Sequence, residues 1–232
     1  MKIELVRSVI GNYDNILPIN STVYDITNLQ ICSKKEASKF LGINLNELTN
    51  QNRYLSRKIK FSNFKSNADI RVWIDGNIYM ENLDMLIKNF ISSGADIAVA
   101  KHPLRNSLNN ELKACLMGKK INLKQYYLVS SFLNSFHDDM NNLCQSGVML
   151  RKKSSKLDLC FDEIINLLEK YVPRDQLFLR KTLNDNNIPI MLYDLEKFPI
   201  KISDHNISIF EKIIKKFNYH FFKIIFKLKI MS

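Results

Sequence analysis

Short apolar runs alternate with segments of helical spacing along most of the chain. Apolar and β-branched runs predict strands at residues 2–10, 22–31, 72–74, 96–100, 146–151 and 188–193. Apolar residues that recur every three or four positions predict helices at residues 34–41, 44–50, 82–92, 109–117, 123–134, 157–171 and 173–183. Strands separated by helices of about ten residues indicate an α/β sandwich with a mostly parallel sheet.

Polar residues stand where several of these strands end. Asp14, Asp75, residues 101–105 and Ser146 all lie at or next to a predicted strand end. Right-handed crossovers bring the carboxyl ends of parallel strands to one edge, and open α/β sheets bind their ligands there. We therefore expect these residues to line one cleft.

Asp75 is the most informative of these acids. It follows the buried run Val72-Trp73-Ile74 and precedes Gly76-Asn77. A carboxylate and an amide oxygen two residues apart can hold Mg²⁺ or Mn²⁺, which can in turn hold phosphate. The alternative is a turn in which both side chains only satisfy backbone groups.

Composition bounds the class of protein. With 46% hydrophobic and 25% charged residues, the 232-residue chain can bury a sizeable core. Charges interrupt the apolar residues at the N-terminus, so no signal peptide is expected, and no uninterrupted apolar run reaches the length of a membrane span. The four cysteines are scattered without a Cys-x-x-Cys pair, which argues against a zinc knuckle and favours reduced thiols in a cytosolic protein.

Positive charge is concentrated at the end of the chain. Residues 207–232 hold six Lys and one Glu, a net charge of +5 out of +11. We divide the chain into a domain at residues 1–206 and a basic tail at residues 207–232. An anionic partner is expected mainly at the tail, either a membrane surface or nucleic acid.

The tail itself predicts an amphipathic helix over residues 207–230. Its apolar positions, mostly Ile and Phe, recur at helical spacing, and most of its lysines lie off that stripe. Basic amphipathic helices with Phe and Ile on one face typically lie in a membrane interface. The alternative is a helix docked on the core of the protein or on a second subunit.

The order of motifs resembles a known family. The chain carries, in order, Ile10-Gly11-Asn12-Tyr13-Asp14, Arg57 with Lys60, Trp73-Ile74-Asp75-Gly76-Asn77, Lys101-His102-Pro103-Leu104-Arg105, Glu111, Gly147 with Arg151, and Arg174-Asp175-Gln176. This series resembles a glycosyltransferase-like domain, of the TOD/MUCI type, shared by plant Golgi proteins of pectin and mucilage synthesis and by bacterial surface-polysaccharide clusters. One position departs from the pattern, because Asn28 stands where the family has Asp.

The resemblance implies a GT-A-like, Rossmann-type fold that uses a nucleotide-sugar donor and a divalent metal, Mn²⁺ or Mg²⁺. It implies that Asp75, Asn77 and His205 hold the metal. The residues implied to contact the donor or the acceptor are Asn12, Tyr13, Arg57, Lys60, Lys101, His102, Arg105, Gly147, Arg174 and Gln176.

Two acids are candidates for catalysis. Asp175 either serves the active site, as a base or a sugar ligand, or only stabilises a helix N-terminus, which would contribute about 0.3–1 kcal/mol. Glu111 is either catalytic or a solvated helix acid. His102 either binds a sugar hydroxyl or caps its strand.

The function predicted from these features is sugar transfer to a glycan or lipid-linked glycan acceptor in capsule, lipopolysaccharide or O-antigen synthesis. We expect a cytoplasmic enzyme peripheral to the inner face of the membrane, bound to anionic lipid through its tail. The alternatives are a metal-dependent nuclease or nucleic-acid-binding protein, and a non-catalytic membrane scaffold. Few aromatic residues are interleaved with basic residues outside the tail, so no nucleic-acid partner is expected.

Overall fold

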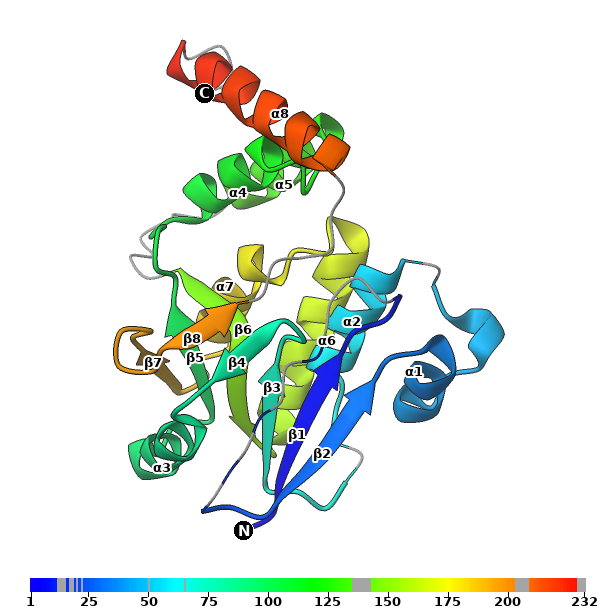
Figure 1. Ribbon diagram of the computed structural model, residues 1–232, viewed down its shortest axis with the longest axis vertical. Coiled ribbons are helices and arrows are strands. Elements are labelled where there is room, and N and C mark those ends of the chain that lie inside the picture. The colour runs from blue at the N-terminus through cyan, green and yellow to red at the C-terminus, as the bar shows by residue number, and fades with distance from the viewer. Residues whose placement is uncertain are drawn as a thin grey trace.

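A six-stranded sheet forms the middle layer of the fold (Figure 1). The computed structural model describes residues 1–228 apart from 12–15, 17–18, 20, 22, 50, 65, 135–142 and 203–208. The sheet has the order β2-β1-β3-β6-β5-β7, and β6 alone runs against the other five strands. The predicted mostly parallel α/β fold is therefore confirmed. The strands are β1 (Ile3–Ser8), β2 (Ile26–Ile31), β3 (Ile70–Ile74), β5 (Ile97–Lys101), β6 (Cys144–Lys152) and β7 (Ile190–Tyr193).

Helices cover the sheet and extend beyond it. Two short strands, β4 (Ile78–Met80) and β8 (Ile200–Ile202), pair separately as an antiparallel ribbon. The helices are α1 (Lys34–Leu41), α2 (Asn52–Phe61), α3 (Leu83–Ser93), α4 (Leu108–Met117), α5 (Leu123–Asn134), α6 (Ser155–Lys170), α7 (Leu179–Asp185) and α8 (Ile209–Lys227). Two 3₁₀ turns complete the described elements, η1 (Leu45–Glu47) and η2 (Asp175–Leu177).

Alternation along the strands produces two separate cores. In β3, Trp73 faces a large core that α2, α4, α5, α6 and α7 share. Its neighbours Val72 and Ile74 face a smaller core with α3 and the β4–β8 ribbon. Successive side chains of a strand point to opposite faces, so both faces of the sheet are buried and the strands read as apolar runs.

The reversed direction of β6 matters for the site. Its first residues lie beside the last residues of β5, where Lys101 is opposite Cys144. The amide of Asp75, just past the end of β3, donates to the carbonyl of Gly147 at 2.8 Å. Ser146 and Gly147 therefore reach the carboxyl edge of the sheet from the amino-terminal part of an antiparallel strand.

Local structure departs from the prediction in several places. Helix α2 is absent from the predicted set, because its inward face includes the polar residues Ser56 and Lys60, both at most 1% exposed. The helix predicted at 44–50 shortens to η1, where the Asn44 amide donates to the Glu47 carboxylate and caps no backbone amide. The predicted helix at 173–183 divides into η2 and α7, and β2 begins at Ile26.

Helix α8 packs at one end of the molecule, across α4 and away from the sheet (Figure 1). None of the helices in the described ranges is both long and apolar enough to cross a bilayer.

Candidate functional site

Asp175 lies at the centre of a buried ion cluster at the carboxyl edge. Its carboxylate accepts a hydrogen bond from Lys60 Nζ at 2.8 Å and one from Ser146 Oγ at 2.7 Å, and Arg57 Nε lies 3.2 Å away. Asp175 is 3% exposed and the Lys60 side chain is fully buried. Burial opposes ionisation, but Arg57, Lys60 and Ser146 together hold the pKa of Asp175 well below its usual value. The carboxylate is therefore an anion held by two hydrogen bonds and by an ion pair with Arg57.

Asp75 stands next to this cluster, on a turn that the sheet fixes from two sides. The Arg7 guanidinium of β1 donates to the carbonyls of Asp75, Gly76 and Ile78 at 3.2, 2.6 and 3.0 Å. Trp73 Nε1 donates to the Asp75 carboxylate at 2.7 Å. Gly76 packs on Val9 so closely that an added Cβ would lie 2.0 Å from a Val9 methyl. Packing against Val9 therefore requires glycine at position 76, next to Asp75.

The two aspartates share the same cations. Arg57 and Lys60 each approach Asp75 Oδ1 to 3.9 Å while they contact Asp175 more closely. They are three residues apart on α2, so they lie on one face of the helix. The predicted convergence of Asp75, Arg57 and Lys60 with Asp175 is therefore present in the structure.

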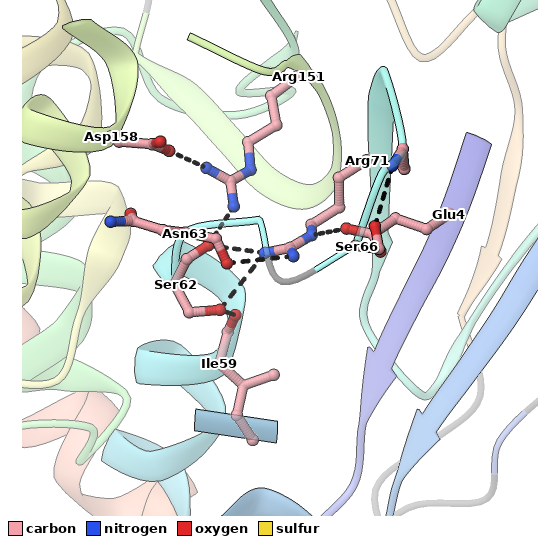
Figure 2. Close-up of polar contacts among 9 residues, drawn as sticks. Glu4, Ile59, Ser62, Asn63, Ser66, Arg71, Arg151 and Asp158 are labelled. Carbon is pink, nitrogen blue, oxygen red and sulfur yellow. Dashed lines mark hydrogen bonds and ion pairs between the residues drawn. The ribbon is translucent and has the colours of Figure 1, made fainter. Parts of the chain in front are cut away.

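Two buried arginines fix the far end of α2 (Figure 2). Arg71 of β3 and Arg151 of β6 are opposite one another in the sheet, and both donate to the carbonyl of Ser62, which caps α2. Glu4 and Asp158 pair with Arg71 and Arg151 respectively. The resemblance groups Arg151 with Gly147, but the structure places Arg151 at the end of β6 distant from Gly147, where it supports the helix that carries Arg57 and Lys60.

Glu111 is the centre of a second buried cluster, on α4. It is 1% exposed, so it is not the solvated helix acid that the sequence allowed as an alternative. Arg105 Nε donates to its Oε2, Cys115 Sγ donates to Oε1 at 3.4 Å, and His102 Nε2 lies 3.6 Å from Oε2. The ring nitrogen Nδ1 of His102 accepts from the amides of Leu104 and Arg105 at 3.2 and 3.1 Å, so the ring caps the turn after β5. Burial, and then the charge of Arg105, lower the pKa of His102.

Further cations lie around both clusters. Burial, and next the charges of Arg53 and Arg57, lower the pKa of Arg174, which precedes Asp175, to about 10. Burial and then Arg174 likewise lower the pKa of Lys120. The Arg174 Nε atom is buried and has no hydrogen-bond partner in the described part of the chain. The cations here outnumber the acids Asp75, Glu111 and Asp175, an environment that attracts a polyanion.

The other expected site residues have different surroundings. Lys101 pairs at 3.0 Å with Asp194, which follows β7, and both side chains are about half exposed. Gly147 has no room for a side chain, because a Cβ there would lie 2.7 Å from Ile78 Cδ1 and 3.6 Å from Asp75 Oδ2. Gln176 lies in η2 and is partly exposed. Asn12, Tyr13 and His205 are outside the described residues.

The acids offer one candidate position for a hard cation. Among the described residues, no three His, Cys, Asp or Glu side chains gather as a metal site. The Asp175 carboxylate already accepts hydrogen bonds from Lys60 and Ser146 and pairs with Arg57, whereas the Asp75 side chain is 27% exposed. The partly exposed carboxylate of Asp75 is an oxygen donor of the kind that Mg²⁺ and Mn²⁺ take, so Asp75 fits such an ion, whereas Asn77 is buried at 7% exposure.

Sequence reasoning overlooked several members of the site. Arg7, Arg53 and Lys120 had no motif to mark them, and the Trp73 indole was read only as a core residue. One signal was available for α2: the three-residue spacing of Arg57 and Lys60 puts two cations on one helical face.

Comparison with known proteins gives structural similarity alone. No protein-family model matches the sequence, and no curated protein is significantly similar to it. Mouse xyloside xylosyltransferase 1 in its apo form superposes with a TM-score of 0.45 at 10% identity, over 84% of this chain and 86% of that chain.

Two further structures are similar to a comparable degree. The galactosyltransferase LgtC, in complex with donor and acceptor sugar analogues, has a TM-score of 0.41 at 10% identity and covers 83% of this chain and 73% of its own. The 4-diphosphocytidyl-2C-methyl-D-erythritol synthase of Anaerococcus prevotii has a TM-score of 0.39 at 9% identity and covers 96% and 98%.

Proposed function

We propose that this chain is a glycosyltransferase that moves a sugar from a nucleotide-sugar donor to a glycan acceptor. In such a reaction the oxygen of an acceptor hydroxyl forms a bond to the anomeric carbon as the bond between that carbon and the phosphate oxygen breaks. The nucleoside diphosphate leaves, and the hydroxyl proton passes to it or to solvent. The site must therefore hold and neutralise a polyanion. The series of motifs that resembles the glycosyltransferase-like TOD/MUCI family supports this assignment.

One observation carries the proposal: cations and acids from distant parts of the chain converge at the carboxyl edge of the sheet. Arg57 and Lys60 come from α2, Asp75 from the end of β3 and Asp175 from η2. This edge is where open α/β sheets bind nucleotides. Arg57, which is 17% exposed at its side chain, is the cation of this group best placed to meet a ligand.

We assign Asp175 to positioning. A carboxylate whose pKa is held far below its usual range is a weak proton acceptor, and efficient bases have a pKa near the working pH. By holding Arg57 and Lys60, Asp175 orients two cations toward the diphosphate. Glu111 has the same relation to Arg105, because it is buried beneath that guanidinium.

A divalent cation fits beside Asp75. We assign it to Asp75, with Asn77 and His205 as further candidate ligands, and the diphosphate itself would supply additional oxygens. Bound Mg²⁺ or Mn²⁺ would neutralise charge on the leaving diphosphate. Arg57 and Lys60, each 3.9 Å from Asp75 Oδ1, add positive charge at the same position.

The biological setting follows from the family resemblance and the basic tail. We propose a role in surface-polysaccharide synthesis at the cytoplasmic face of the inner membrane, with a glycan or lipid-linked glycan as acceptor.

The test is turnover of nucleotide-sugars by the full chain with Mn²⁺ or Mg²⁺, measured as release of the nucleoside diphosphate. We expect one donor of the panel to be hydrolysed and Asp75→Asn to lose at least about tenfold in rate, a loss of roughly 1.4 kcal/mol of transition-state stabilisation. Glu81→Gln, which removes an exposed ion pair with Lys201, serves as the control and should retain the wild-type rate. Equal rates in wild type and Asp75→Asn would refute the role of Asp75.

A further inference from the structure

Helix α8 is attached to the protein through one of its faces. The Asn218 amide donates to the carbonyls of Leu116 and Met117, at the last turn of α4, at 2.9 and 3.0 Å. Phe222 and Phe226 are partly buried against the main core, and the Phe226 ring lies 5.8 Å from that of Tyr126. These contacts fix which side of α8 faces the body of the protein.

The opposite face of α8 is apolar and exposed. It consists of Ile213, Phe217, Phe221, Ile224 and Leu228, whose exposed fractions are 61, 73, 49, 59 and 62%. Successive members are three or four residues apart, so they form one stripe about 23 Å long. We call this stripe the outer face of α8. Contiguous apolar surface of this kind marks an interaction site.

Charge indicates what covers the outer face. Lys216, Lys223 and Lys227 are exposed on the same helix, and residues 207–232 hold six Lys against one Glu. A second copy of the helix would bring like charges together, and nucleic acid would leave the Phe and Ile side chains in water. A partner with an apolar interior and an anionic surface would cover the Phe and Ile side chains and also pair with the lysines.

We propose that the outer face of α8 docks into the interface of an anionic lipid bilayer. Phe217, Phe221 and Ile224 bury in the boundary between headgroups and acyl chains, while the lysines contact anionic headgroups. The helix then lies along the membrane plane and is held to the protein by Asn218 and Phe226.

This docking would place the candidate site close to lipid. Helix α4, which holds α8 at Leu116 and Met117, carries Glu111 five and six residues earlier, about 8–9 Å along the helix. Helices α4, α5 and α8 lie together at one end of the molecule (Figure 1). A lipid-linked acceptor would thus meet the cleft near the membrane surface, although the docking does not depend on the transfer reaction.

The experiment is co-sedimentation of the full chain with vesicles of phosphatidylcholine alone or mixed with phosphatidylglycerol. Wild type should bind the mixed vesicles, bind the neutral ones much more weakly, and dissociate as salt is raised. The triple variant Phe217→Gln, Phe221→Gln, Ile224→Gln should lose about tenfold or more of this binding, because its apolar burial is removed. Circular dichroism and thermal melting would show that it is folded.

A matched control removes apolar surface elsewhere. Leu104, Leu159 and Val23 are 80, 70 and 70% exposed outside α8, and their replacement by Gln should leave vesicle binding unchanged. Equal binding by the outer-face variant and wild type would overturn the proposal, as would equal binding to neutral and anionic vesicles. A wild-type dimer in light scattering that the outer-face variant dissociates would assign the face to a second copy and also overturn it.

Discussion

At the scale of single residues, the two aspartates of the site differ in their burial and in their ion-pair partners. Asp175 and Asp75 share Arg57 and Lys60, but Asp175 is buried and accepts two hydrogen bonds, while the Asp75 side chain is 27% exposed. The same cations therefore hold one carboxylate as a fixed counter-ion and leave the other available to a ligand. This difference in environment, rather than residue type, separates the roles we assign to the two acids.

Asp175→Asn should reduce stability in a pH-dependent way. The folded-state pKa of Asp175 lies below its usual 3.8, so the ionised carboxylate stabilises the folded protein above about pH 4 and this contribution is lost as pH falls. The variant removes the closer counter-ion of buried Lys60 and leaves only Asp75 at 3.9 Å, so we expect a loss of about 3–5 kcal/mol at neutral pH.

Urea denaturation of wild type and Asp175→Asn between pH 3 and pH 8 measures this effect. The difference between their free energies of unfolding should be constant above about pH 5 and should become smaller below about pH 4. Parallel stability profiles across the whole range would contradict the assigned pKa direction.

The close packing of Gly76 against Val9 gives a second prediction. A methyl group at Gly76 would overlap Val9 Cγ2, so Gly76→Ala should destabilise the protein by about 1–3 kcal/mol through overpacking. In a Val9→Ala background the obstructing methyl is absent, so adding Gly76→Ala should be much less destabilising. A double-mutant cycle by urea denaturation measures this coupling, and additive effects of the two substitutions would show that the overlap is relieved elsewhere.

At the scale of elements, helix α2 links two buried polar clusters: the acids at the carboxyl edge of the sheet, and the Arg71–Arg151 pair farther from that edge. The helix presents Arg57 and Lys60 to the acids, and the carbonyl of its C-cap residue Ser62 accepts from Arg71 and Arg151 (Figure 2). Cations at a helix C-terminus complement its partial negative charge. Burial, opposed by Asp158 and Glu4 and reinforced by Arg71, lowers the pKa of Arg151 to about 9. The arginine pair therefore sets where α2 ends and, through the helix, where its site cations lie.

Arg151→Met should destabilise the fold by about 3 kcal/mol, because it breaks a buried ion pair and removes a donor to Ser62. Lys201→Met, which breaks the exposed pair with Glu81, is the matched control and should change the free energy of unfolding by less than about 1 kcal/mol. Equilibrium urea denaturation compares the two. If both variants lose a similarly small free energy of unfolding, the buried ion pair of Arg151 contributes no more to stability than the exposed pair of Lys201.

At the scale of the whole molecule, the sequence predicts the architecture well and the polar clusters only in part. Apolar strand runs such as Val72-Trp73-Ile74 reveal a sheet buried on both faces. No sequence pattern reveals that β6 runs antiparallel to its neighbours. A strand that is buried on both faces of the sheet is an apolar run whichever direction it takes. Helix α2 was not predicted because the polar residues Lys60 and Ser56 interrupt its apolar pattern. Both are buried through partners distant in sequence, since Lys60 donates to Asp175 and Ser56 hydrogen-bonds to Ser8.

The candidate site shows the same limit. The order of motifs groups Asp75, Arg57, Lys60 and Asp175, whose side chains lie near one another in the structure. It did not reveal that Asp175 accepts a hydrogen bond from Ser146, or that Arg7 holds the Asp75 turn by its carbonyls. Such contacts join residues that are tens of positions apart, and only the folded chain specifies them.

The proposed function requires that Arg57, Lys60 and Asp75 together bind a nucleoside diphosphate. Isothermal titration calorimetry of a panel of nucleoside mono- and diphosphates, with wild type and Arg57→Met, tests it most directly, with Lys201→Met as the control. We predict that one diphosphate binds more tightly than its monophosphate and that Arg57→Met weakens it by about 10- to 100-fold, the loss of one charge-assisted hydrogen bond. Absence of diphosphate binding by wild type, or equal affinity in wild type and Arg57→Met, would contradict the account.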